Sequence, residues 1–349
     1  MIVLGIETSC DETAVALVRE GREVLASVVA SQVELHARFG GVVPEVASRR
    51  HLEAINPCVD RLLEQAGLGL ADIGGIAVTN RPGLVGSLLV GVSAAKAYAF
   101  ALGLPLVGVH HIEGHIYANL LRTDEGGPEL RFPFVCLVAS GGHSDLVLAE
   151  GHGRLTLLGR TRDDAPGEAL DKIARLLGLP QPGGKEIDRV AREHRGPKVD
   201  FPVADLGESL DFSFSGVKTA VARYVAQLTP EELNEQRGAI AAGFEEAIVK
   251  PLVANTLRAA EECGVQRVAV GGGVAANTLL REKLSALAAE RGLELWIPPR
   301  WLCTDNAAMI AAAGHYRLAR GEDDGLALDT FATAPLSAER AAEEGRAAR

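Results

Sequence analysis

Aromatic residues are scarce in this chain: they make up 4% of its 349 residues, whereas hydrophobic residues as a whole make up 47%. We therefore expect a core of Ala, Val and Leu, and we do not expect a stacking platform for nucleic-acid bases. Basic residues are outnumbered as well. Lys and Arg total 35 against 46 for Asp and Glu, giving a net charge of −11, which disfavours strong autonomous binding to a polyanion.

Cysteine is sparse, and no CxxC pair occurs. The five cysteines are odd in number and widely scattered, which argues against a disulfide framework or a zinc knuckle and predicts a reduced, cytoplasmic protein. The first residues, MIVLGIETSCDE, have no basic region and meet Glu7 early, unlike a signal peptide. The long apolar stretch Leu84–Val109 contains several glycines and Lys96, so it predicts a buried helix followed by a strand and not a membrane span.

The chain alternates strand-like and helical segments, and at this length it predicts an α/β protein of two domains. The predicted strands are Ile2–Glu7, Ala14–Arg19, Ile76–Thr79, Leu106–His110, Phe134–Ala139, Ser144–Glu150, Leu155–Arg162, Val265–Gly271 and Glu294–Ile297. The predicted helices lie near 45–66, 85–102, 112–121, 167–177, 185–194, 214–227, 235–263, 275–290 and 305–319.

A weak internal repeat supports two related lobes. VLGIETSCDETAVALV and FVCLVASGGHSDLVLAE both have a strand, a small polar turn and a second strand. They suggest a duplicated domain, although any two α/β domains can open with a hairpin. We predict lobes at 1–125 and 126–349, a helical insertion near 165–235, a connection at Leu121–Arg131 and an exposed tail at Ser337–Arg349.

The segment His111-Ile112-Glu113-Gly114-His115 is the sharpest chemical signal. Two histidines four residues apart lie on one helical face, close enough to share a metal ion, although such a pair can also be structural. The helix would follow a buried strand, where ligands gather in open α/β sheets. A zinc peptidase motif would need Glu directly after the first His, and Ile112 stands there.

Asp305 is a candidate third ligand. It opens an Ala-rich helix, where its alternative role is to cap the helix N-terminus. Two histidines and one carboxylate with open positions suit Fe²⁺ or Zn²⁺.

Several turns suit a phosphate or a nucleoside. Ser140-Gly141-Gly142-His143 could bring backbone N–H groups to an anion, or be only a tight turn. The matching turn in the first copy contains Asp11 and Glu12, which are candidates for acid–base chemistry or cation binding. Alternatively, this turn is only solvated. A strand–glycine–helix layout occurs at 270–277, and glycine-containing turns open helices at 167–172 and 182–188. In the last two, Asp171 or Asp188 could accept hydrogen bonds from ribose hydroxyls or simply start a helix.

Two hairpin-opened lobes with these turns resemble the superfamily of actin, the heat-shock chaperone ATPases and the sugar kinases. The detailed motifs resemble one branch, the tRNA adenosine threonylcarbamoyltransferase family (TsaD). They span nearly the whole chain, in order: GIETSCDETA at 5–14, HHIEGH at 110–115, FPFVCLVASGGHSDL at 132–146, GEALDKIARLLGLPQPGGKEID at 167–188, DFSFSGVKTAV at 211–221, GGGVAANTLLR at 271–281 and CTDNAAMIA at 303–311.

This resemblance implies a duplicated actin-like fold with a central cleft. It also implies transfer of the threonylcarbamoyl group from L-threonylcarbamoyladenylate to N6 of the adenosine 3′ of the anticodon, in tRNAs that read codons beginning with adenine. It implies a metal site, Fe²⁺ first and Zn²⁺ second, made of His111, His115 and Asp305, and adenylate contacts from Val138, Ala139, Ser140, Gly141, Gly142, Asp171, Gly184, Asp188 and Asn277. Asp11 and Glu12 match the family's acidic turn. It further implies a paralogous partner subunit (TsaB-like) and an ATPase subunit (TsaE-like).

Two positions depart from the family pattern. Arg81 replaces a glycine in Thr79–Leu84, and Lys185 replaces a proline beside the expected ribose-binding turn. Two other functions remain as alternatives: a nucleotide-binding ATPase or regulator of the sugar-kinase-like fold, and a metallopeptidase, against which Ile112 counts.

Overall fold

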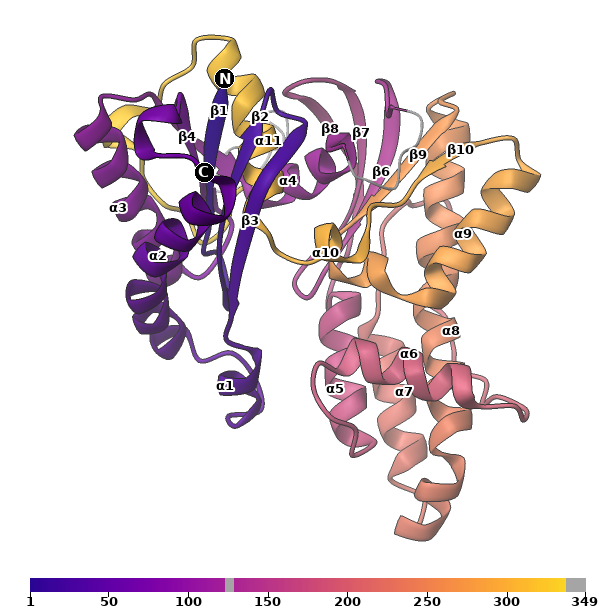
Figure 1. Ribbon diagram of the computed structural model, residues 1–349. Helices are drawn as coiled ribbons and strands as arrows, with labels where there is room; N and C mark the ends of the chain where they lie inside the picture. The colour runs from indigo at the N-terminus through magenta and orange to yellow at the C-terminus, as the bar shows by residue number, and fades with distance from the viewer. Residues whose placement is uncertain (123–128, 337–349) are drawn as a thin grey trace, which may run out of the picture. The chain divides into compact units, whose positions relative to one another are not determined.

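The computed structural model describes residues 1–122 and 129–336, which divide into two compact units (Figure 1). The first unit combines residues 1–130 with the chain from Thr304 onward, and the second unit is Arg131–Cys303. We expected one break near residue 125 with everything after it in the second lobe; instead the C-terminal stretch returns to the first unit. Most of the expected connection at 121–131 and all of the expected tail at 337–349 lie outside the described residues.

The first unit is built on a five-stranded mixed sheet in the order β3-β2-β1-β4-β5. The strands are β1 (Ile2–Glu7), β2 (Glu12–Arg19), β3 (Glu23–Ser31), β4 (Gly75–Arg81) and β5 (Leu106–His110). β1, β2 and β3 pair antiparallel, and β4 and β5 continue the sheet parallel to β1. β1 and β5 are almost wholly apolar because helices cover both faces of the sheet.

Helices α2 (Pro44–Ala66) and α3 (Val85–Leu102) pack on one face of this sheet, where Leu4 and Ile6 of β1 join their core cluster. Helix α11 (Ala307–Ala319) packs on the other face, toward which Gly5 points. A Cβ on Gly5 would lie 2.2 Å from the carbonyl oxygen of Ala307, so only glycine permits this approach. This packing is what draws the C-terminal stretch into the first unit.

By length and composition, α3 is the one helix among residues 1–122 and 129–336 that could cross a membrane. Its contacts with α2 and β4 agree with the predicted packed helix. Shorter elements complete the unit: α1 (Val33–Ala37), α4 (His111–Tyr117) and 3-10 turns at Leu70–Asp72, Ala118–Leu120 and Gly325–Ala327.

The second unit repeats the first sheet's plan, with the order β10-β9-β6-β7-β8. Its strands are β6 (Phe134–Ala139), β7 (Ser144–Gly151), β8 (Arg154–Arg160), β9 (Arg267–Gly271) and β10 (Glu294–Trp296). β6, β7 and β8 pair antiparallel, while β9 and β10 run parallel to β6, as β4 and β5 do to β1. The matching topologies confirm that the two hairpins seen in the sequence open duplicated units.

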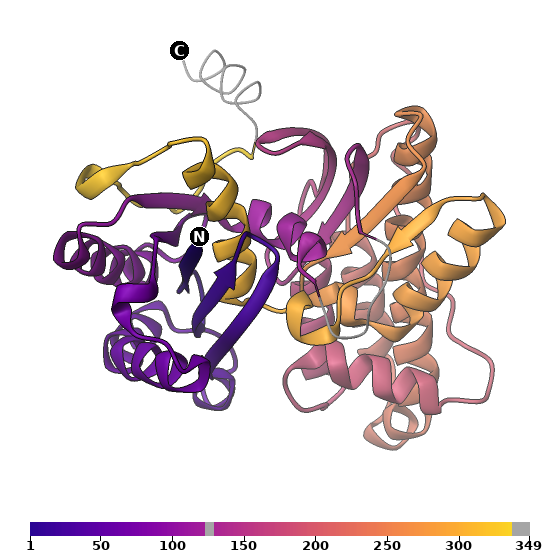
Figure 2. The same ribbon diagram turned by 45° about the horizontal axis from the view of Figure 1, so that its top comes forward.

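Along the chain, most helices of the second unit come between β8 and β9; they are drawn in pink to orange in Figure 2. They are α5 (Pro166–Leu176), α6 (Gly183–Glu193), α7 (Ser215–Val225) and the long α8 (Pro230–Glu262), followed after β9 by α9 (Thr278–Glu290) and α10 (Arg300–Cys303). The predicted helical insertion near 165–235 therefore contains α5, α6 and α7 and ends at the start of α8. A 3-10 turn at Gly273–Ala276 links β9 to α9.

The element predictions missed β3, α1 and α10. β3 is an edge strand whose side chains are largely half-exposed or exposed, so its sequence EVLASVVAS lacks the long buried run that marks β1 or β6. α1 and α10 are too short to show helical periodicity.

Candidate metal centre and nucleotide-binding turns

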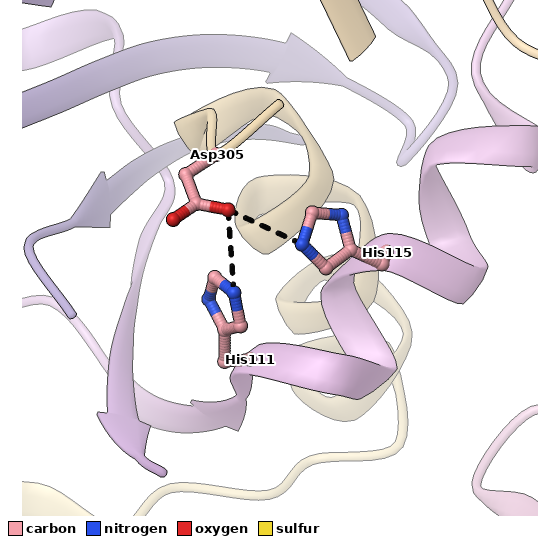
Figure 3. Close-up of side chains that lie close together, drawn as sticks. All are labelled: His111, His115 and Asp305. Atoms are coloured by element: carbon pink, nitrogen blue, oxygen red, sulfur yellow. Dashed lines mark ion pairs between the residues drawn. The ribbon is translucent and has the colours of Figure 1, made fainter. Parts of the chain in front are cut away.

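His111, His115 and Asp305 come together in the first unit (Figure 3). Nε2 of His111 lies 3.4 Å from Oδ1 of Asp305, and Nε2 of His115 lies 3.3 Å from the same oxygen. The candidate ligand atoms all lie within 4.8 Å of one another. Both histidines are on α4, which begins where β5 ends, and Asp305 precedes α11, which packs against α4.

Asp305 is not the cap of α11. Asn306 takes that role, because its side chain accepts a hydrogen bond from the backbone N–H of Met309 at 3.0 Å. Asp305 is thereby left to face the two imidazoles. Of its two predicted roles, the geometry favours the ligand.

Glu7, at the end of β1, completes the surroundings of His111 and was missed in the sequence. Its Oε2 lies 3.0 Å from Nδ1 of His111 and also accepts a hydrogen bond from the hydroxyl of Thr79. Its Oε1 accepts from the backbone N–H of Ser9. A carboxylate that accepts the second N–H of a histidine fixes the ring's orientation and makes its other nitrogen a better metal ligand.

The charges favour a cation at this place. Although burial lowers the pKa of His111, the carboxylates of Asp305 and Glu7 raise it well above the usual value. Burial of the Asp305 carboxylate opposes its ionisation, yet the imidazoles of His111 and His115 hold its pKa well below the usual range. Without a metal, a proton on His111 supplies the positive charge; metal binding would displace that proton.

His115 fits the same interpretation. It is fully buried, and neither of its ring nitrogens has a hydrogen-bond partner within residues 1–122 and 129–336, although Nε2 faces Asp305. Burial lowers the pKa of His115, which keeps the ring neutral, the form that binds metals. Two buried imidazoles that face one carboxylate make a suitable donor set for Fe²⁺ or Zn²⁺.

The acidic turn between β1 and β2 adjoins this centre. The hydroxyl of Ser9 lies 3.2 Å from Nδ1 of His111. Oε1 of Glu12 accepts a hydrogen bond from the hydroxyl of Ser31 at 2.8 Å, while Oε2 is buried without a partner among the described residues. Burial, together with the negative charges of Asp11 and Asp305, raises the pKa of Glu12 to about 7. Such a carboxyl group is poised to take up a proton near neutral pH.

The neighbouring residues of the HHIEGH segment do not form a peptidase site. Ile112 is buried in the core, and Glu113 experiences the charges of Arg317 and Arg81. Arg81 itself is half-buried and donates to the side-chain oxygen of Asn80 at 3.0 Å. Lys185, the second departure, is exposed in the first turn of α6.

The predicted nucleotide-binding residues lie in the second unit, in two groups joined by α5. The first group is the turn after β6. Val138 and Ala139 end that buried strand, the backbone N–H of Ser140 donates to the carbonyl of His143 at 2.8 Å, and Gly141 and Gly142 are exposed. Apart from chain neighbours, no described atom lies within 4 Å of a Cβ built on either glycine, so there is free space beside both residues.

The start of α5 packs against this turn and forms backbone hydrogen bonds with it. The backbone N–H of Gly167 donates to the carbonyl of Ser140 at 3.2 Å. A Cβ on Gly167 would lie 2.7 Å from that oxygen, which explains the glycine. Gly272, which follows β9 and has a φ of 84°, also lies close to the end of β6, because a Cβ built on it would be 2.3 Å from the carbonyl oxygen of Ala139.

The second group gathers at the starts of α6 and α9. Oδ1 of Asp171 accepts from the backbone N–H of Gly183 at 2.8 Å, next to Gly184. Oδ1 of Asp188 accepts from the backbone N–H of Thr278 at 2.9 Å, next to Asn277. Both carboxylates thus accept hydrogen bonds from backbone N–H groups at the starts of helices, which agrees with their alternative, structural role. The same hydrogen bonds bring Asp171, Gly184, Asp188 and Asn277 to one part of the unit.

Comparisons with known proteins identify the relatives of this chain. A model of the tRNA N6-adenosine threonylcarbamoyltransferase family matches residues 23–312. The relative of that name from Symbiobacterium thermophilum is 55% identical over 90% of this chain and 91% of its own length. The one from Geobacter metallireducens is 53% identical over 96% of this chain and 97% of its own length.

Solved structures show the fold. Full-length HypF in a phosphate- and nucleotide-bound form matches with a TM-score of 0.59 at 12% identity, covering 91% of this chain and 55% of that one. The activator of the 2-hydroxyisocaproyl-CoA dehydratase from Clostridium difficile, with bound ADPNP, matches with a TM-score of 0.51 at 16% identity over 93% of this chain and 99% of that one. The expected actin-like α/β fold is confirmed. On its sequence relatives, the chain belongs to the tRNA N6-adenosine threonylcarbamoyltransferase family and is a tRNA-modifying transferase.

Proposed function

We propose that this protein transfers the threonylcarbamoyl group from L-threonylcarbamoyladenylate to N6 of the adenosine 3′ of the anticodon, in tRNAs that read codons beginning with adenine. The observation that carries this proposal is the family match over nearly the full chain. The cluster of His111, His115 and Asp305 agrees with it, since an ATPase or sugar kinase of this fold would not need such a centre.

The donor is a mixed anhydride and is already activated, so no nucleophilic Ser or Cys is required. The N6 amine forms a bond to the carbamoyl carbon, the bond from that carbon to the phosphate oxygen breaks, and AMP leaves with the electron pair. The amine also loses one proton. The protein must therefore position both substrates, stabilise developing negative charge and accept that proton.

The second unit would bind the adenylate. Phosphate and carbonyl oxygens are acceptors, and they suit the backbone N–H groups of the exposed Gly141 and Gly142 and the hydroxyl of Ser140. Ribose hydroxyls are donors and suit the carboxylates of Asp171 and Asp188, which lie at the helix starts beside Gly184 and Asn277.

His111, His115 and Asp305 would hold one divalent metal ion, with Fe²⁺ preferred and Zn²⁺ second. When bound, such an ion acts as a Lewis acid that stabilises negative charge on a substrate oxygen. Glu7 would keep the His111 ring in place through its bond to Nδ1. Glu12, whose pKa is about 7, is our candidate for the proton acceptor, with Asp11 beside it.

We further propose a paralogous partner subunit and an ATPase subunit in the cytoplasm. A chain with a net charge of −11 needs help to hold tRNA. The partner would dock on the outer faces of α2 and α3, because these helices expose four large apolar side chains: Leu52, Val85, Leu89 and Phe100. Phe100 is 77% exposed, unusual for a phenylalanine that no partner covers.

The test is reconstitution with partners, threonylcarbamoyladenylate and tRNA, followed by nucleoside analysis and metal analysis. We expect modified adenosine from the wild-type protein, and loss of both metal and product from His111→Ala with the fold retained. Full activity in metal-free His111→Ala would exclude the metal from the chemistry. Steady ATP hydrolysis by the isolated chain, with no tRNA modification, would support the regulator alternative instead.

A further inference from the structure

Glu245 is a buried carboxyl group that the proposed chemistry does not use. It lies on α8 within a run of buried apolar residues that includes Phe244 and Ile248, and it is only 3% exposed. Burying a carboxyl group is costly unless it makes specific hydrogen bonds. An apolar residue would serve packing at this position, so the carboxyl group calls for another explanation.

Its hydrogen-bond partner in the described part of the chain is Asn277. Nδ2 of Asn277 donates to Oε1 of Glu245 at 2.6 Å. Burial raises the pKa of Glu245 to about 7, so both protonation states occur near neutral pH. Either state keeps an oxygen that can accept this hydrogen bond.

The other end of the Asn277 amide is fixed as well. Asn277 caps α9, and its Oδ1 accepts a hydrogen bond from the backbone N–H of Leu280 at 2.9 Å. The amide oxygen is thus committed to the helix and the nitrogen to Glu245. A primary amide carries two N–H groups, and Glu245 takes one of them. The second N–H group of the Asn277 amide is therefore left as a hydrogen-bond donor for a ligand.

We propose that Glu245 is a positioning residue for the nucleotide site: it holds the Asn277 amide so that its second N–H meets an acceptor atom of the bound adenylate. This inference rests on the proposed function. The matching group on the ligand is an acceptor, such as a ribose or phosphate oxygen or a ring nitrogen. With an apolar residue at 245, the amide nitrogen would lack its buried partner and the amide would turn away from this orientation.

The test compares Glu245→Gln with Glu245→Leu in the reconstituted system. Gln keeps an acceptor for Nδ2 of Asn277, so KM for threonylcarbamoyladenylate should stay near the wild-type value. Leu removes the acceptor, and KM should rise about 3- to 10-fold, the effect of one hydrogen bond, with little change in kcat. Equal KM values in the three proteins, or an equal rise in both variants, would overturn the proposal.

Glu246→Gln is the matched control. Glu246 is the next residue on α8 but pairs with Lys198 and Lys283 at the surface, so its substitution should leave KM unchanged. A rise in KM for Glu246→Gln as large as that for Glu245→Leu would also count against a specific role for Glu245.

Two further variants decide the matter if Glu245→Leu does not fold. Asn277→Asp keeps a good helix cap but has no N–H group, and combining it with Glu245→Gln restores a hydrogen bond between the two side chains. We expect KM to remain high in the double variant, because the donor to the ligand is absent; a wild-type KM there would show that the pair is only structural. Failure of the wild-type protein to modify tRNA would instead count against the proposed function.

Discussion

The imidazole of His111 is held by the carboxylate of Glu7, whose Oε2 lies 3.0 Å from Nδ1 of the ring. Because Glu7 is buried at the end of β1 and its side chain also accepts from Ser9 and Thr79, its position is fixed by the sheet itself. The opposite ring nitrogen then faces Asp305. The central strand of the first unit thus sets the orientation of His111, a candidate metal ligand on α4.

Replacing Glu7 by Gln should weaken metal binding. An amide offers one acceptor oxygen in place of two and turns an N–H donor toward Ser9, Thr79 or His111, so the His111 ring loses its fixed orientation. We expect the metal dissociation constant to rise about 10- to 100-fold, measured by competition with a chelator. We also expect a loss of about 1–3 kcal/mol in the free energy of unfolding.

Thr79→Val provides the control for Glu7→Gln. It removes one donor to the same carboxylate but leaves the charge of Glu7 and its bond to His111. Its metal affinity should change far less than that of Glu7→Gln. Wild-type metal affinity in Glu7→Gln would show that Glu7 does not orient the ligand.

Glu12 should give the chemical step a pH dependence. As the proton acceptor it must be ionised, and burial raises its pKa to about 7. The single-turnover rate should therefore increase with pH and level off above about 7. A bound cation near Asp305 would favour the carboxylate, so the apparent pKa should lie no higher than this. Rapid-quench measurements across the pH range provide the check.

Glu12→Gln should be slower by about 100- to 10,000-fold and should lose this pH dependence. Because the folded-state pKa exceeds that of the unfolded chain, the native state retains a proton as pH rises from about 4.5 toward 7. The contribution of Glu12 to stability accordingly falls over that interval, and Glu12→Gln should remove this fall. An unchanged rate–pH profile in the variant would assign the proton to another group.

The sequence predicted the strands and helices that have long buried runs, and it predicted His111 and His115 as candidate metal ligands because HxxxH spacing is local. Glu7 and Glu245 could not be recognised in this way. Each gains its meaning from a partner far along the chain, His111 for Glu7 and Asn277 for Glu245. A single acidic residue at a strand end or in a helix carries no local pattern that would mark it.

The sequence pattern also could not predict that the chain from Thr304 onward belongs to the first unit. Nothing in the Ala-rich segment 305–319 specifies which sheet it covers, since small residues suit close packing against either one. The decisive contact is the approach of Ala307 to Gly5, a pair about 300 residues apart. The duplication of the sheet plan, by contrast, was suggested by the repeated hairpins.

Gly5→Ala should disturb the candidate metal centre by displacing α11. The new Cβ would lie 2.2 Å from the carbonyl oxygen of Ala307 and 2.9 Å from the side chain of Ala311, so α11 must move away from β1. Such overpacking costs about 1–3 kcal/mol, which denaturant unfolding would measure. Because Asp305 lies two residues before Ala307, the shift should also displace it from His111 and His115 and weaken metal binding.

Gly41→Ala is the matched control for Gly5→Ala in the same unit. No described atom lies within 4 Å of a Cβ built on Gly41, and its φ is not in the left-handed region, so stability should change by no more than about 0.5 kcal/mol. Metal affinity should match the wild type. Gly5→Ala with wild-type stability would contradict the close packing of α11 on β1. A destabilised Gly5→Ala that keeps full metal affinity would show that Asp305 is held independently of that packing.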